Sequence, residues 1–66
     1  MTITQLNYVL ALNKHKNFTK AAEKCFVTQP TLSTQIQKLE DELDIIIFDR
    51  GKKPIELTDV GRKIVI

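Results

Sequence analysis

Amide and hydroxyl side chains gather in one uncharged stretch of the chain, from Thr28 to Gln37. Such groups both donate and accept hydrogen bonds, which is the chemistry that reads base edges in the DNA major groove, and a glutamine amide suits adenine. A solvated helix face is usually rich in glutamate and lysine instead. The composition favours hydrogen-bonded recognition of a polar partner, with a merely polar, soluble face as the alternative. The side chains expected to project outward are Gln29, Ser33, Thr34 and Gln37.

Groups that could support catalysis or metal binding are sparse. His15 and Cys25 have no partner at the spacing of a metal site or a catalytic pair, and Ser33 has neither a base nor a glycine-rich elbow. A single cysteine cannot form an intrachain disulfide. We therefore expect no catalytic residue, no metal site and no cofactor, and an enzyme is the least favoured class. Cys25 is interpreted as a small buried apolar residue.

Capping signals predict where the supporting helices begin. Thr2 followed by Gln5 fits a capping box, so a first helix is expected over residues 3–14. Asn17 is a good N-cap for a short second helix. Thr28 is a third N-cap, and the proline two positions later needs no amide partner in a first turn. Three consecutive helices are therefore predicted.

Apolar residues at helical spacing predict which faces are buried. On this basis the third helix extends to Leu43 and lays one face on the core. Between the second and third helices, the side chains of Phe26 and Val27 are expected to fill the corner. The predicted core positions are Ile3, Leu6, Val9, Leu10 and Leu12, then Phe18, Ala21, Ala22 and Cys25, then Leu32, Ile36, Leu39 and Leu43.

A change of pattern after the third helix predicts a two-stranded hairpin. Residues 45–48 form a β-favouring apolar run, and residues 50–54 are typical of a turn. In residues 55–57 apolar and polar side chains alternate, as in a strand. Thr58 can cap a last helix. Because that helix ends on apolar residues with nothing to pack against, we expect either further chain or a second copy on this surface. The hairpin tip is basic, with Arg50, Lys52 and Lys53.

Charge is unevenly distributed, although the net charge is only +2. Residues 1–38 contain five lysines against one glutamate, residues 39–49 contain five acids and no base, and residues 50–66 contain five basic residues against two acids. Such segregation fits a polyanion partner or a mixed solvated surface. The acids at the far end of the third helix would repel phosphate, so its N-terminal half is expected to enter DNA. They are Glu40, Asp41 and Glu42.

The length of 66 residues allows one small domain. The chain contains no leader-like segment and no apolar run of roughly 18 residues that could span a membrane. We therefore expect a soluble cytoplasmic protein without membrane association.

Five motifs follow one another along the chain. They are Phe18-Thr19-x-Ala21-Ala22, Val27-Thr28-Gln29-Pro30-x-Leu32-Ser33-x-Gln35-Ile36, Leu39-Glu40-x-Glu42-Leu43, Phe48-x-Arg50 and Leu57-Thr58-x-x-Gly61. Together they resemble the N-terminal domain of LysR-type transcriptional regulators, over essentially the whole chain and without gaps. Further stretches resemble the peroxide-responsive activators of the OxyR type within that family. These are Tyr8-Val9-Leu10-Ala11-Leu12, Cys25, Gln29-Pro30-Thr31-Leu32-Ser33 and Lys38-Leu39-Glu40-Asp41-Glu42-Leu43.

The resemblance implies a mainly α fold, a winged helix-turn-helix with a three-helix core, a two-stranded wing and the start of a linker helix. The DNA-binding domain would cover residues 1–58, with the helix-turn-helix at 18–37, and the linker helix would begin over residues 59–66. Double-stranded DNA would be the partner, read at an inverted-repeat promoter site by a homodimer formed through the linker helix. A full-length protein of this kind can assemble as a tetramer. The effector domain, with any peroxide-sensing cysteines, would lie beyond this chain, so no effector is expected to bind here.

The same resemblance assigns the DNA contacts. The alternative function is a protein-interaction module that uses the exposed face of the third helix. The residues expected to contact DNA are Thr28, Gln29, Pro30, Thr31, Ser33, Thr34, Gln37 and Lys38 in the third helix and Arg50, Lys52 and Lys53 in the wing.

Three positions depart from the family pattern. Thr34 stands where the family usually has arginine, which removes one guanidinium contact and leaves the base preference there undetermined. Asp44 replaces a usual glycine, so a left-handed turn there would cost about a few tenths to one kcal/mol. Lys16 stands where glycine is frequent, and the sequence suggests no function for it.

Overall fold

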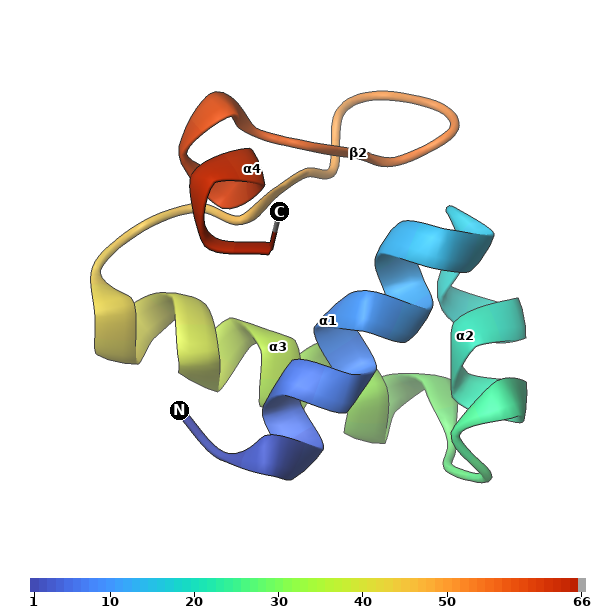
Figure 1. Cartoon of the computed structure of the whole chain (residues 1–66). Coiled ribbons are helices and arrows are strands. Elements are labelled where there is room, and N and C mark those ends of the chain that lie inside the picture. The colour runs from blue at the N-terminus through green and yellow to red at the C-terminus, as the bar shows by residue number, and fades with distance from the viewer. Residues whose placement is uncertain (66) are drawn as a thin grey trace.

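Residues 1–65, as described in a computed structural model, form three packed helices, a short hairpin and a further helix. The elements are α1 (Ile3–His15), α2 (Phe18–Lys24), α3 (Gln29–Leu43), β1 (Phe48–Asp49), β2 (Glu56–Leu57) and α4 (Asp59–Val65). The hairpin and α4 lie together on one side of the three-helix layer (Figure 1). This is the predicted winged helix-turn-helix with its three-helix core. Of the residues assigned to a linker helix, only residue 66 lies outside the described part.

The predicted capping side chains fix the starts of the first three helices. Thr2 Oγ1 accepts from the Gln5 backbone N–H at 3.0 Å, and Gln5 Oε1 accepts from the Thr2 backbone N–H at 3.1 Å. This is the predicted capping box. Asn17 Oδ1 accepts a backbone N–H of α2 at 2.8 Å, and Thr28 Oγ1 accepts one of α3 at 3.4 Å. Local hydrogen bonds therefore set the boundaries on which the helix-turn-helix depends.

Residues in the left-handed conformation end α1 and α3. Asp44 ends α3 with φ 55°, as its place in the family pattern predicted. Lys16 ends α1 with φ 56°, and its backbone N–H donates to the Leu12 carbonyl at 2.8 Å. Each costs about 1 kcal/mol relative to glycine, since Cβ is crowded in this conformation. Lys16, for which the sequence suggested no function, therefore has a structural one.

The core is built from one face of each helix and the inner residues of the hairpin. The predicted stripe of α3 is confirmed, because Leu32, Ile36 and Leu39 are at most 1% exposed. In α1, Ile3 and Leu10 were expected inside, but they are 79% and 43% exposed. They lie two helical turns apart on the face opposite the buried one. The buried apolar residues are Val9, Leu12, Ala21, Ala22, Leu32, Ile36, Leu39, Ile47, Phe48, Ile55 and Leu57.

The corner between α2 and α3 was predicted wrongly in part. Phe26 has φ 59° and is 94% exposed, so it does not fill the corner. The left-handed residue turns the chain so that the next side chain, Val27, packs against the core instead. Val27 and Cys25 therefore close the four-residue connection between the helices.

The wing is shorter than the predicted β-run. Phe48 pairs with Leu57 and Asp49 with Glu56 in an antiparallel register. Of residues 45–48 only Phe48 is in a strand, and Ile46 is 58% exposed. Ile47 is buried and Ile45 packs against the core, so this part of the run is a connection from α3 rather than a strand.

Gly61 provides a testable feature of the join between the wing and α4. A Cβ at this position would overlap the carbonyl of Ile47, whose backbone cannot withdraw easily. Gly61→Ala is therefore expected to destabilise the fold by about 1–3 kcal/mol, despite the better helix propensity of alanine. Urea unfolding followed by circular dichroism measures the change.

Gly51→Ala is the matched control. A Cβ there would meet only the Asp49 side chain, at 3.3 Å, and φ is not positive. The control is expected to change the unfolding free energy by less than about 0.5 kcal/mol. Equal stabilities of the two variants would contradict the close approach at Gly61.

Candidate nucleic-acid interface

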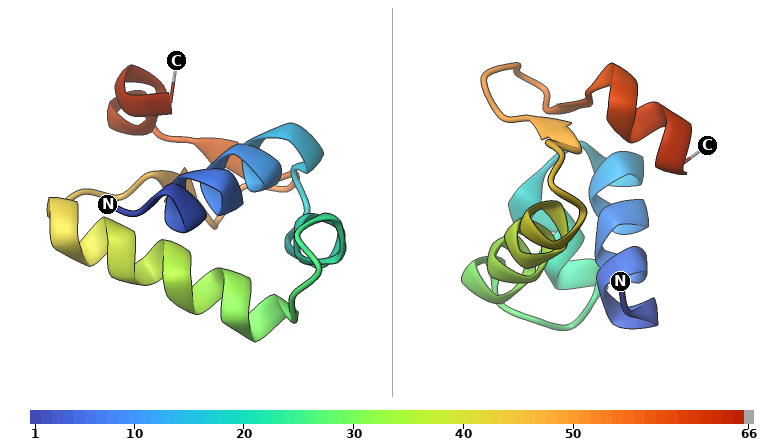
Figure 2. Two further views of the ribbon diagram at one scale, coloured as in Figure 1. Left: turned by 60° about the horizontal axis from the view of Figure 1, so that its bottom comes forward. Right: turned by 90° about the vertical axis from the view of Figure 1, so that its left-hand side faces the viewer.

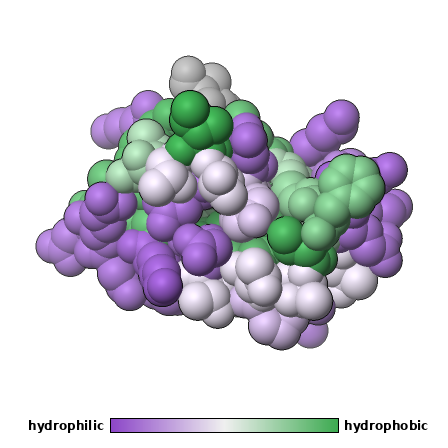
Figure 3. Space-filling model, turned by 90° about the horizontal axis from the view of Figure 1, so that it is seen from below, coloured by the Kyte–Doolittle hydropathy of each residue, from purple (hydrophilic) through white to green (hydrophobic). Residues whose placement is uncertain are grey.

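The outer edge of α3 is the side of that helix turned away from the core. In the right-hand view of Figure 2, α1 and α3 lie on opposite sides of the molecule, so α1 does not cover this edge. Seen from below, the molecule shows a group of side chains of intermediate hydropathy beside strongly hydrophilic ones (Figure 3). The predicted exposure is confirmed for Gln29, Thr34 and Gln37, but not for Ser33. The exposed residues of the outer edge are Gln29, Pro30, Thr31, Thr34, Gln37 and Lys38, and Ser33 is half-buried.

Two glutamine amides on this edge are already held by other side chains. Gln29 Oε1 accepts a hydrogen bond from the Thr19 hydroxyl of α2 at 3.0 Å. Gln37 Nε2 donates to Asp41 Oδ1, one turn further along α3, at 3.1 Å. Each amide therefore has one hydrogen bond within the protein, Gln29 through its oxygen and Gln37 through its nitrogen.

Hydroxyl groups dominate the first turn of α3. Thr28 and Thr31 share a hydrogen bond between their hydroxyl oxygens at 2.9 Å. Thr31 and Thr34 also line a shallow hollow of about 250 Å³ together with Pro30 and Gln35. This part of the outer edge therefore offers small polar groups and little bulk, which permits close approach of another surface.

The Arg50 side chain, at the base of the wing, forms its contacts within the protein. Arg50 Nη2 lies 2.9 Å from Glu40 Oε1, and the Arg50 guanidinium carbon lies 5.8 Å from the centre of the Phe18 ring. The Arg50 side chain is 34% exposed and that of Glu40 only 1%. Arg50 was predicted as a DNA contact of the wing. In this geometry its charge is largely engaged by Glu40 and joins the wing to α2 and α3.

The two lysines of the wing tip differ in whether their charge is paired. Lys52 Nζ lies 3.6 Å from Glu56 Oε2 across the wing, an exposed pair that is weak in water. Lys53 is exposed and has no ion-pair partner within residues 1–65. Of the predicted wing contacts, Lys53 is the one whose charge is most available to a partner.

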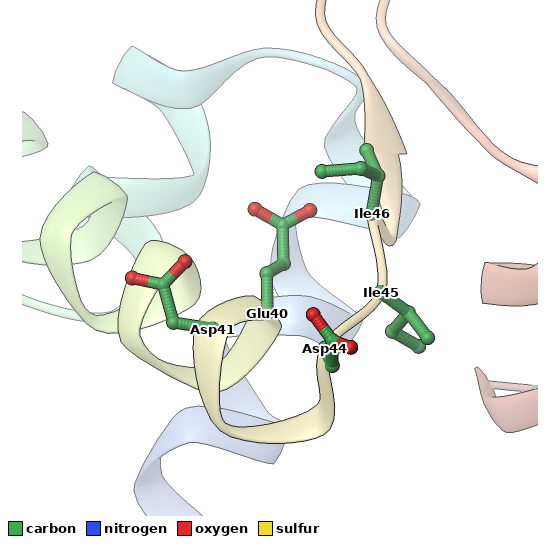
Figure 4. Close-up of a pocket in the computed structure, with 5 residues that line it drawn as sticks. All are labelled: Glu40, Asp41, Asp44, Ile45 and Ile46. Atoms are coloured by element: carbon green, nitrogen blue, oxygen red, sulfur yellow. The ribbon is translucent and has the colours of Figure 1, made fainter.

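Glu40 departs from the role expected of the acidic end of α3. It does not face solvent: one of its oxygens, Oε2, accepts from the backbone N–H groups of Ile47 at 2.7 Å and Phe48 at 3.2 Å. Figure 4 shows its carboxylate directed toward the segment that leads into the wing, away from Asp41. The expectation that it repels phosphate is wrong, because the carboxylate is needed to cap two buried amides. Asp41 and Glu42 are exposed as expected.

A basic hollow between the wing and the start of α2 was not foreseen. Its volume is about 370 Å³. Lys16 contributes to it because the left-handed end of α1 places this residue beside the wing. The density of lysines at the α1–α2 turn and at the wing was visible in the sequence, but their proximity was not. The lining residues are Lys16, Asn17, Phe18, Arg50, Lys52, Lys53, Pro54 and Ile55.

The next residues are those considered for catalysis or metal binding. Cys25 is half-buried against the core and is a free thiol. Within residues 1–65 no three histidine, cysteine or acidic side chains are grouped so that they could hold a metal ion. In the same range no helix is long and apolar enough to cross a membrane.

A short helix, a tight turn and a second helix with a free polar edge, flanked by a basic hairpin, define a winged helix-turn-helix DNA-binding domain. The sequence profile described as "Bacterial regulatory helix-turn-helix protein, lysR family" matches residues 3–62. The chain therefore belongs to the LysR family, as a DNA-binding domain of a transcription regulator.

Relatives of known name agree with this family. The chain is 48% identical over 65 residues to the hydrogen peroxide-inducible genes activator of Haemophilus influenzae, covering 98% of this chain and 22% of that protein. It is 45% identical over 65 residues to the DNA-binding transcriptional dual regulator OxyR of Escherichia coli, covering 98% of this chain and 21% of the relative. The chain thus spans about a fifth of the length of these curated relatives.

Solved structures give the same result. The DNA-binding domain of BenM in complex with catB site 1 DNA superimposes with a TM-score of 0.95 at 42% identity, covering 98% of this chain and 70% of that one. BenM is a regulator of Acinetobacter baylyi. Full-length OxyR of Pseudomonas aeruginosa superimposes with a TM-score of 0.93 at 51% identity, covering 98% of this chain and 22% of that chain.

Proposed function

We propose that this domain recognises a specific promoter sequence by inserting the outer edge of α3 into the major groove while the wing contacts the flanking backbone. The observation that carries the proposal is the exposure of the uncharged, hydrogen-bonding residues of the outer edge, together with a wing lysine, Lys53, that has no ion-pair partner within residues 1–65. Amides and hydroxyls read base edges, whereas lysines neutralise phosphate without sequence preference. The proposed base-reading residues are Gln29, Pro30, Ser33 and Thr34, with Thr28, Thr31, Gln37 and Lys38 beside them.

We further propose that residues 1–58 form the DNA-binding unit and that residues from 59 onward begin a linker helix through which two copies pair. Two exposed apolar side chains of α4, Val60 (46%) and Ile64 (41%), support a partner on this helix. A twofold dimer would read an inverted repeat. A tetramer of the full-length protein and its cytoplasmic location belong to the same proposal.

Peroxide induction is the proposed signal for the full-length protein. Its support is the similarity to two relatives named for hydrogen peroxide or OxyR. Cys25 is not proposed as the sensor, because it packs against the core of this domain. Promoter binding or transcription by the full-length protein is expected to change on treatment with hydrogen peroxide. No response to peroxide would contradict this part alone.

Fluorescence anisotropy tests the DNA-binding proposal. A labelled promoter duplex is titrated with the chain at several salt concentrations, beside a random duplex of equal length. Specific binding is expected to be at least about 1,000-fold tighter than random binding for a complete dimer, and the affinity should fall steeply as salt is added. Equal and weak binding of both duplexes would contradict the proposal.

Lys53→Ala tests the role of the wing. We expect weaker binding to every duplex by a similar factor and a salt slope reduced by about 1, because one phosphate contact is lost. Anisotropy over a salt series on two different duplexes measures both quantities. Lys52→Ala is the matched control and should have the smaller effect, since Lys52 is paired with Glu56. A sequence-dependent loss in Lys53→Ala would contradict the division between helix and wing.

The second candidate is a protein-interaction module on the same side of the molecule. The observation that favours it is Phe26, an aromatic side chain 94% exposed just before α3. Exposed aromatic residues are enriched at protein interfaces. In that case Phe26→Ala would abolish capture of a protein partner and DNA would bind without preference, whereas DNA recognition predicts discrimination between duplexes.

A further inference from the structure

The hydrogen bond between Thr19 and Gln29 links the two helices of the helix-turn-helix at their N-terminal ends. Thr19 is the second residue of α2 and Gln29 the first residue of α3. The Thr19 hydroxyl donates to Gln29 Oε1 at 3.0 Å, and both residues are exposed. No other side-chain hydrogen bond within residues 1–65 joins α2 to α3. The contact therefore reaches the outer edge from a helix that is not itself expected to read bases.

This contact decides which end of the Gln29 amide is available. Reading adenine in the major groove uses both ends of a glutamine amide, because the oxygen accepts from N6 and the nitrogen donates to N7. In this domain Thr19 occupies one acceptor site of the oxygen, whereas the two amide N–H donors of Gln29 have no hydrogen-bond partner within residues 1–65. A guanine offers two acceptors, N7 and O6, to such a group. The contact therefore favours guanine over the adenine that glutamine alone would be expected to read.

Binding to DNA should strengthen the contact. In water an exposed hydrogen bond of this kind competes with solvent and contributes little. Once a duplex covers the outer edge, water is excluded and breaking the bond would leave a polar group without a partner. The orientation of Gln29 would then be fixed at the moment when bases are discriminated.

We propose that Thr19 is a positioning residue that determines specificity. It holds the oxygen of the Gln29 amide and leaves the N–H groups for the DNA, so that Gln29 prefers guanine over adenine at the base pair that it reads. The proposal rests on the proposed function. It assigns to Thr19 an effect on one base-pair position and no direct contact with a base.

Selection from a pool of random duplexes tests it. The chain is incubated with duplexes that carry a randomised stretch of about 20 base pairs, and the bound fraction is sequenced. Gln29→Ala identifies the position that Gln29 reads, since preference is lost there alone. At that position the wild-type chain is expected to favour guanine. Thr19→Val, which keeps the shape and removes the hydroxyl, should shift that preference toward adenine by about threefold to tenfold.

Two further variants distinguish orientation from a structural role. Thr19→Ser retains a hydroxyl and should keep the guanine preference. Gln29→Glu retains the oxygen that Thr19 contacts but lacks the N–H donors, so guanine preference should be lost and cytosine favoured, because a carboxylate accepts from cytosine N4. Both sites are exposed, and unchanged thermal unfolding of Thr19→Val and Gln29→Glu is expected.

The outcomes separate the inference from the function. Adenine preference at the Gln29 position in the wild-type chain would overturn the inference and leave DNA recognition standing. So would an unchanged preference in Thr19→Val, or a uniform loss over all sequences, which would make the hydroxyl a phosphate contact. If the wild-type chain enriched no sequence, the proposed function itself would fail.

Discussion

Thr34→Glu is expected to reduce the affinity for the promoter duplex by about 100-fold while the domain stays folded. Thr34 is exposed on the outer edge of α3, in the N-terminal half that should lie in the groove. A carboxylate placed there faces the phosphates and must be desolvated, and like charges at an interface cost several kcal/mol. About 3 kcal/mol corresponds to about 100-fold in affinity. Fluorescence anisotropy at constant salt measures the loss.

The same substitution at Thr4 is the control. Thr4 is exposed on α1, outside the outer edge of α3, and the change in net charge is identical. Thr4→Glu is expected to lower the affinity by no more than about twofold, since Thr4 lies outside the outer edge and salt screens an exposed charge that makes no contact with the duplex. Thr34→Gln introduces a side chain of the same size as glutamate but without its charge. It should retain most of the affinity, which would identify the charge as the cause of the loss. Equal losses in Thr34→Glu and Thr4→Glu would show that the outer edge is not the DNA-binding face.

Glu40→Ala is expected to have the largest effect on stability, about 3 kcal/mol or more. The variant would leave the buried backbone N–H groups of Ile47 and Phe48 without an acceptor and Arg50 without its partner. Each unsatisfied buried amide costs about 1–3 kcal/mol, and removing one member of a buried ion pair is strongly destabilising. Domains of this size have about 3–10 kcal/mol of stability in total. Urea unfolding should show a chain that is partly unfolded before any denaturant is added.

Glu42→Ala is the matched control for this prediction. Glu42 is an acid on the same helix, two residues away, and its one ion pair is with the N-terminal ammonium group at 2.8 Å on the surface. Its removal should change the unfolding free energy by less than about 1 kcal/mol. Glu40→Gln, which keeps an acceptor for the two amides but no charge, should fall between the two. A Glu40→Ala variant as stable as Glu42→Ala would contradict the role assigned to the buried carboxylate.

The contrast between Glu40 and its neighbours shows where sequence reasoning ended. Caps and apolar periodicity are local signals, and they predicted the helix starts at Thr2, Asn17 and Thr28 and the buried stripe of α3. The burial of Glu40 depends on two amides from a segment seven and eight residues further on. An acid among other acids carries no local mark of that environment.

Backbone conformation and contacts between distant segments explain the wrong assignment of Phe26 and the ion pair of Arg50, which the sequence does not reveal. Phe26 looked like core because it is apolar and next to Val27, but a left-handed backbone at Phe26 sends the two side chains to opposite sides. Arg50 looked like a free wing cation because its partner lies ten residues earlier on α3. The outer edge could be predicted, since an uncharged helix face is a property of one helix alone. The Thr19–Gln29 contact could not, because it joins two helices.

A nuclear magnetic resonance titration of the isotope-labelled chain tests the central claim, that the outer edge of α3 is the surface that meets DNA. The duplex enriched by selection is added stepwise and the backbone amide shifts are followed. The largest changes are expected over residues 28–38 and 50–54, with Ile3 and Leu10 on the opposite face unaffected. Changes concentrated around Ile3 and Leu10, with residues 28–38 unmoved, would contradict it.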